Sequence, residues 1–144
     1  MLFKKLLRKV LALLLIVGLG YGCWMLYGQN KTRKNEIGNE FATAYHTLVE
    51  ELAKETPDAT KTIRQGAVMR AMYQKSKYNK GDDTDLTKVV EALYSASANP
   101  SELPINEETK TILLDVYQKE FSEKSIKAAK ERIDAIRSVL STRS

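Results

Sequence analysis

The chain has 144 residues, and its 23 lysines and arginines against 18 aspartates and glutamates give a net charge of +5. Four of these cations and none of the acids lie in the first 29 residues, so the other 115 residues hold 19 cations and 18 acids. The excess of cations is therefore confined to the N-terminus and gives no reason to expect binding to DNA or RNA. Residues 30–144 contain no cysteine, which excludes a disulfide, a thiolate zinc site and a cysteine nucleophile there.

An uncharged apolar run from Val10 to Tyr27 dominates the N-terminal part of the chain. A helix of this length extends over roughly 27 Å, close to the hydrocarbon thickness of a bilayer. Lysines and arginines stand directly before it, as they do before many membrane anchors. We therefore predict a basic tail and membrane anchor over residues 1–29, followed by one helical domain over residues 30–144. The positions that represent the anchor are Val10, Leu14, Gly18, Gly22, Trp24 and Tyr27.

A cleaved signal peptide and a lipoprotein signal are two alternatives to an anchor. Gly20 and Gly22 place small residues before Cys23, which would be the acylated residue of a lipoprotein. Tyr21 fits such a site poorly, and the apolar run continues past it to Tyr27. The uncleaved anchor is the interpretation that we adopt.

The cations on the two sides of the apolar run predict its orientation, because the side richer in lysine and arginine stays in the cytoplasm. Four of them precede the run, and Lys31, Arg33 and Lys34 follow it. We expect a cytoplasmic N-terminus, a single pass through the inner (cell) membrane and a periplasmic or other extracytoplasmic C-terminal domain. Trp24 and Tyr27 would then lie at the outer interface, where amphipathic rings accumulate.

Helical spacing begins after the polar segment that follows Gly28. One stripe predicts the first helix of the domain, and its residues are Ile37, Phe41, Ala44, Leu48 and Leu52. Pro57 predicts that this helix ends near Thr56, since the residue before a proline avoids the helical conformation. Pro57 also suits the first turn of the next helix, with Thr56 as its N-cap.

The apolar residues of the second helix are spread around its axis and comprise Ile63, Ala67, Val68, Ala71, Met72 and Tyr73. We expect Gly81 to take a positive φ after it and the neighbouring acids to cap the third helix. That third helix has one clear apolar face, made of Leu86, Val89, Val90 and Leu93. Pro100 and Pro104 predict an extended connection beyond it.

Asn106 is the predicted N-cap of the fourth helix, whose first turn holds Glu107 and Glu108. Its apolar face comprises Ile112, Leu113, Val116, Tyr117 and Phe121. The pattern then changes phase, which predicts a break between residues 122 and 125. A narrow seam with alternating spacings of three and four follows, formed by Ile126, Ala129, Ile133, Ile136 and Leu140. The fold class is all-α, with a bundle of four or five helices after the anchor.

The residues that could carry chemistry do not form a recognisable catalytic or metal-binding set. His46, the single histidine, lies beside the apolar stripe, and no second imidazole or thiolate is present in the domain. Asp82, Asp83 and Asp85 lack the closing glutamate of a calcium loop, so they are interpreted as turn and cap residues. The pairs at 50–51 and 107–108 are adjacent on helices and point to different sides. We predict no catalytic site, no cofactor and no metal.

Two features point to association with other helices. Gly18 and Gly22 form a GxxxG pattern, which lets membrane helices approach closely and would make a homo-oligomer. The seam over 126–140 is narrow, which suits one facing helix. That helix could belong to the domain itself, to a protein partner or to a second copy.

The function that we predict from these features is binding of a protein partner at the outer face of the membrane, as a scaffold, inhibitor or regulator. The short basic tail, single anchor and charged helical domain resemble the layout of the inner-membrane spanins of phage lysis. This resemblance covers the architecture alone, and the seam is shorter than the long coiled coils of spanins. A hydrolase of the cell envelope is a third alternative, which the lack of an acid, base or nucleophile set disfavours.

Overall fold

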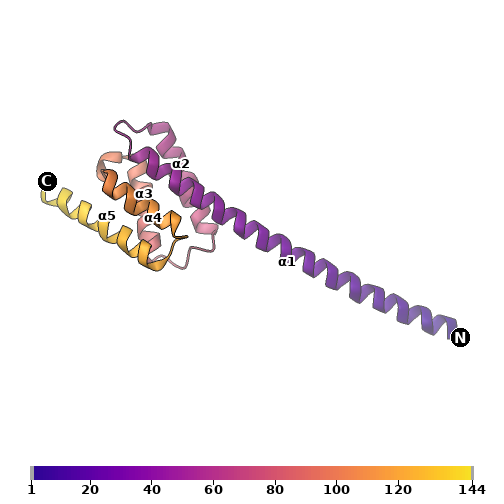
Figure 1. The fold of residues 1–144 in the computed structure, drawn as a ribbon. Coiled ribbons are helices and arrows are strands. Elements are labelled where there is room, and N and C mark those ends of the chain that lie inside the picture. The colour runs from indigo at the N-terminus through magenta and orange to yellow at the C-terminus, as the bar shows by residue number, and fades with distance from the viewer. Residues whose placement is uncertain (1, 144) are drawn as a thin grey trace. The chain divides into compact units, whose positions relative to one another are not determined.

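The computed structural model describes the backbone of residues 2–143 and the side chains of residues 2–28 and 35–142. It divides into two compact units, Met1–Asn35 and Glu36–Ser144, and we call the second the helical domain. Figure 1 shows the elements, which are α1 (Leu2–Leu52), α2 (Ala59–Lys75), α3 (Asp85–Ala98), the short 3₁₀-helix η1 (Pro100–Glu102), α4 (Glu107–Gln118) and α5 (Glu123–Arg143). The boundary predicted between residues 29 and 30 stays a prediction.

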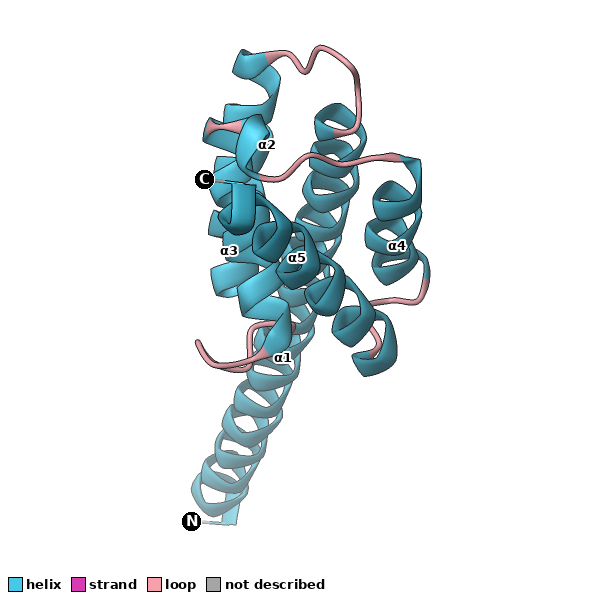
Figure 2. Ribbon diagram, turned by 90° about the vertical axis from the view of Figure 1, so that its left-hand side faces the viewer, coloured by secondary structure: helices cyan, strands magenta, loops and turns pink. Residues whose placement is uncertain are grey.

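The all-α fold class is confirmed, with one long apolar N-terminal helix followed by a small helical bundle. Figure 2 shows helices joined by loops, without a strand among residues 2–143. The segment after Gly28 does not separate two helices, because α1 is helical throughout from Leu2 to Leu52. No proline interrupts it, and proline is the residue that most strongly ends a helix.

The turn between α1 and α2 differs from the prediction at both of its ends. α1 ends at Leu52 rather than near Thr56, and α2 begins at Ala59, with Asp58 and not Thr56 as its N-cap. The Asp58 carboxylate accepts hydrogen bonds from the backbone N–H groups of Thr60 and Lys61. Pro57 therefore lies before the helix instead of in its first turn.

The apolar residues of α2, which the sequence spreads around the helix axis, are mostly exposed. The buried residues are Thr62, Gly66, Met69 and Tyr73, whereas Ile63 is 53% exposed. α2 approaches α3 so closely that a Cβ on Gly66 would lie 2.6 Å from the Ser97 Cβ. The Thr62 hydroxyl donates to the Ser97 carbonyl oxygen at 2.9 Å across the same contact. Two of the buried residues, Thr62 and Gly66, are small, and a search for apolar residues alone does not find them.

α3 follows the prediction closely. Gly81 has a φ of +125°, and the four predicted apolar residues of α3 are all buried. The N-cap is Thr84, whose hydroxyl accepts from the backbone N–H of Thr87, and not one of the aspartates. The connection after α3 is not wholly extended, since Pro100–Glu102 form η1.

A break separates α4 from α5, but it lies at residues 119–122 rather than at 122–125, because α4 ends earlier than its apolar pattern suggests. Asn106 caps α4 as predicted and accepts from the Thr109 N–H at 2.8 Å. α4 ends at Gln118, and the Phe121 N–H then bonds the Val116 carbonyl while the Glu120 N–H bonds that of Tyr117. This pair of bonds is the Schellman motif, which needs a left-handed residue at the position of Glu120. Phe121 is buried, but it lies after α4 and not on its face.

Glu120→Gly is expected to stabilise the domain by about 0.5–1 kcal/mol, because Glu120 has a φ of +52° and glycine adopts that conformation without a steric penalty. Thermal unfolding of the full chain in detergent micelles measures the change. Lys119→Gly is the matched control, because the φ of Lys119 is −93° and glycine only adds flexibility there. Equal shifts of the melting temperature in the two variants would contradict the assignment of strain to Glu120.

An aromatic cluster joins the helices at one end of the helical domain. The Phe41 ring centroid lies 5.0 Å from that of Phe121 and 5.2 Å from that of Tyr73. Tyr45 is fully buried beside them, and its hydroxyl donates to the Leu113 carbonyl oxygen at 2.7 Å. Burial raises the pKa of this hydroxyl, so it remains a donor at all physiological pH values. The bond fixes α1 against α4 within the domain.

Candidate functional site

The predicted anchor positions lie in an apolar helix, Leu2–Gly28, whose large apolar side chains are exposed. Leu2–Gly28 is long and apolar enough to cross a membrane, with a mean hydropathy of 2.1. Large apolar residues are exposed around it, among them Val10, Leu14, Trp24 and Tyr27. A signal sequence near the N-terminus can have the same length and composition, so Leu2–Gly28 is a candidate membrane span. Gly18 and Gly22 have no neighbouring atom within 4 Å of a Cβ position.

The seam of α5 is divided between the core of the domain and its surface. Ile126, Ala129 and Ile133 are buried, and Ile133 is only 2% exposed. α5 makes its contacts with α3 and α4, which therefore cover this part of the seam. Ile136 and Leu140 are only half-buried, and Val139 beside them is 51% exposed. The structure thus leaves the last two turns of the seam available for a partner.

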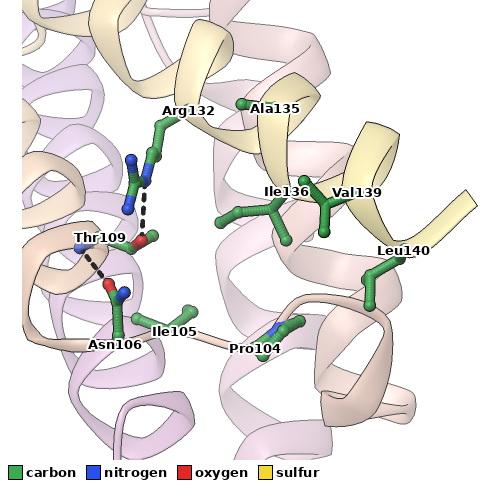
Figure 3. A pocket seen from close by; sticks show the side chains of 9 residues that line it. All are labelled: Pro104, Ile105, Asn106, Thr109, Arg132, Ala135, Ile136, Val139 and Leu140. Atoms are coloured by element: carbon green, nitrogen blue, oxygen red, sulfur yellow. Dashed lines mark hydrogen bonds between the residues drawn. The ribbon is translucent and has the colours of Figure 1, made fainter. Parts of the chain in front are cut away.

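These last turns form one wall of a groove of about 460 Å³. We call it the α5 groove. Its lining residues are Pro104, Ile105, Asn106, Thr109, Arg132, Ala135, Ile136, Val139 and Leu140. Figure 3 shows the side chains of α5 on one side and those of the connection between η1 and α4 on the other. The lining is mainly aliphatic, which is typical of sites that bind apolar groups.

Hydrogen bonds fix the polar end of the groove. The Arg132 Nε donates to the Thr109 hydroxyl at 3.1 Å, and its Nη2 lies 3.3 Å from the Glu108 carboxylate. Thr109 is itself held by Asn106, which accepts from its backbone N–H (Figure 3). Arg132 therefore joins α5 to the first turn of α4 and keeps the two walls of the groove at a fixed spacing.

A second hollow, of about 610 Å³, lies between the loop before α3 and the start of α5. Charged side chains of both signs interrupt its apolar lining, namely Lys80, Asp83, Asp85, Glu123 and Lys127. A partner that covers these charged groups must pair each of them to offset the loss of their hydration. The α5 groove, with fewer charged groups in its lining, is therefore the stronger candidate for a binding site.

His46 lies on the surface of α1, half-exposed, and has no nucleophile as a neighbour among the contacts of the described residues. Its Nε2 lies 3.5 Å from the Glu50 carboxylate, and its ring stacks at 4.9 Å on that of Tyr117. These contacts are those of a surface residue that packs one helix on another.

The two carboxylates at 50 and 51 point to different sides, as predicted. Glu51 is buried and accepts from the Lys54 ammonium at 2.7 Å and from the Asp58 backbone N–H at 3.0 Å. Both bonds favour the charged form and lower the pKa of the Glu51 carboxyl group. Glu51 thus connects the end of α1 to the cap of α2, which is a structural role.

The aspartates after Gly81 belong to a turn and to the start of α3, as their sequence pattern indicates. Within the described part of the chain, no three histidine, cysteine or acidic side chains come together as a metal site would require.

Sequence reasoning assigned Ile136 and Leu140 to a seam and Asn106 to a helix cap, but it did not find the groove that these residues line. Val139 lies outside the seam of threes and fours, and Pro104 was assigned to a connection. Val139 stands three residues after Ile136 and one before Leu140, and this spacing was the one signal in the sequence that could have added it to the seam. No protein-family model matches the chain, and no curated protein or solved structure matches it.

Proposed function

We propose that this chain is a single-pass membrane protein whose helical domain binds a protein partner at the outer face of the membrane, through the α5 groove. The observation that carries the proposal is an aliphatic groove bordered by a valine that is 51% exposed. Leaving aliphatic side chains in water costs about 25 cal/mol for each Å² of apolar surface. A protein partner that covers Ile136, Val139 and Leu140 removes this cost.

The orientation in the membrane is the part of the proposal that rests on the flanking cations. Four lysines and arginines precede the apolar helix, and three follow it closely. A reporter enzyme that is active only outside the cytoplasm, fused after Ser144, is expected to be active. A reporter that is active only in the cytoplasm serves as the control at the same position. Activity of the cytoplasmic reporter alone would reverse the proposed topology.

The groove itself is tested with a photoreactive amino acid placed at position 139 in the full, membrane-embedded chain. Irradiation is expected to give one crosslinked protein band, because Val139 borders the groove. The matched control is the same amino acid at Ser138, which is exposed and does not line the groove. Ile136→Ser should weaken the band from position 139. Equal crosslinking from 138 and 139, or none from 139, would reject the groove as the docking site.

A further inference from the structure

The α5 groove also indicates the chemistry of its partner, and the inference drawn here rests on the function proposed above. We infer that the partner presents an α-helix with an aliphatic stripe and with acidic residues along the flank that meets α5. Two features of α5 support a partner of this kind, the spacing of its exposed aliphatic residues and its charge.

The spacing of the exposed residues favours a helical partner. Ile136, Val139 and Leu140 stand at positions i, i+3 and i+4, the spacing into which the side chains of one facing helix interdigitate. A helix bonds its own backbone N–H and C=O groups internally, so it can dock on these aliphatic residues through its side chains alone.

The charge of α5 favours an acidic flank. From residue 132 onward the chain contains Arg132, Arg137 and Arg143 but only one acid, Asp134. Arg132 is already paired with Glu108. Arg137 is exposed and lines one hollow with Leu140 and Glu102, but none of the ion pairs among the described residues includes Arg137. Carboxylates on the partner would meet Arg137 at the rim, where complementary charge orients a docking helix and raises its association rate.

The same charge argues against a second copy of this chain as the occupant. A dimer through the groove would bring two α5 helices together, each with an excess of arginine over its last turns. Like charges that face each other across an interface are unfavourable. The occupant is therefore a different protein with an acidic amphipathic helix.

The test uses the full chain in nanodiscs of neutral lipid and two synthetic 15-residue helical peptides as probes. Both peptides carry the same leucine stripe at spacings of three and four, with glutamate at the flanking positions in one and lysine in the other. Fluorescence anisotropy is expected to show about tenfold tighter binding of the glutamate peptide at low salt, with a smaller difference at 0.5 M salt. Arg137→Glu should remove this preference.

Val139→Asp is expected to abolish binding of both peptides, whereas Ser138→Asp, which adds the same charge outside the groove, should change it little. Binding that depends on Val139 but is equal for the two peptides, or tighter for the lysine peptide, would overturn the acidic partner and leave the docking function standing. Failure of both peptides to bind would also overturn the acidic helical partner. It would leave the docking function standing, because crosslinking at position 139 tests that function separately. A dimer of the full chain that Val139→Asp dissociates would identify a second copy as the occupant instead.

Discussion

Ile133→Asp is expected to unfold the helical domain. Ile133 is 2% exposed and lies in the part of α5 that α3 and α4 cover. An unpaired carboxylate in such a place costs several kcal/mol, and it comes in addition to the lost aliphatic contacts. The whole stability of a domain of this size is about 5–15 kcal/mol. The variant should therefore lose the cooperative thermal transition that the wild-type chain shows by circular dichroism.

Val139→Asp is the matched control for this experiment, because it places the same charge on the same helix six residues further on. Val139 is 51% exposed, so its replacement should lower the melting temperature by no more than a few degrees. Both variants are measured as full chains in the same detergent. An Ile133→Asp chain that melts with the wild type would show that α5 does not pack on α3 and α4 as described.

Local signals in the sequence were sufficient for the fold class and for several helix ends. Asn106 was recognisable as a cap because its amide accepts from an N–H only three residues away. Gly81 was recognisable because few other residues adopt a positive φ readily. The buried face of α3 followed from aliphatic residues at helical spacing. Each of these features depends on a few neighbouring residues and therefore does not require knowledge of the tertiary contacts.

The face of α2 and the α5 groove depend on residues that are distant in sequence, and the sequence pattern did not predict either. Gly66 is buried because Ser97 lies against it, and 31 positions separate the two. The groove exists because the connection around Pro104 passes beside the part of α5 from Arg132 to Leu140, which lies 28 to 36 residues further along the chain. Hydrophobic periodicity describes one helix at a time and contains no information about which helix approaches it.

Gly66→Ala is expected to destabilise the domain by about 1–3 kcal/mol, although alanine is the better helix former by about 1 kcal/mol. The new methyl group would contact the Ser97 hydroxyl and would lie 2.6 Å from its Cβ, well inside the van der Waals distance. α2 and α3 would have to separate, which also stretches the bond from the Thr62 hydroxyl to the Ser97 carbonyl. The steric cost and the weakened hydrogen bond together exceed the gain in helix propensity.

Thermal unfolding of the full chain measures this effect, with roughly 4–8 °C expected for each kcal/mol. Gly38→Ala is the control, since a Cβ there would lie 3.4 Å from the Tyr78 ring in ordinary contact, and the change should be neutral or stabilising. Ser97→Gly in the Gly66→Ala background should recover part of the loss, because it removes the atoms that the new methyl group meets. A Gly66→Ala chain as stable as the Gly38→Ala chain would mean that α2 and α3 are further apart at this crossing than the structure places them.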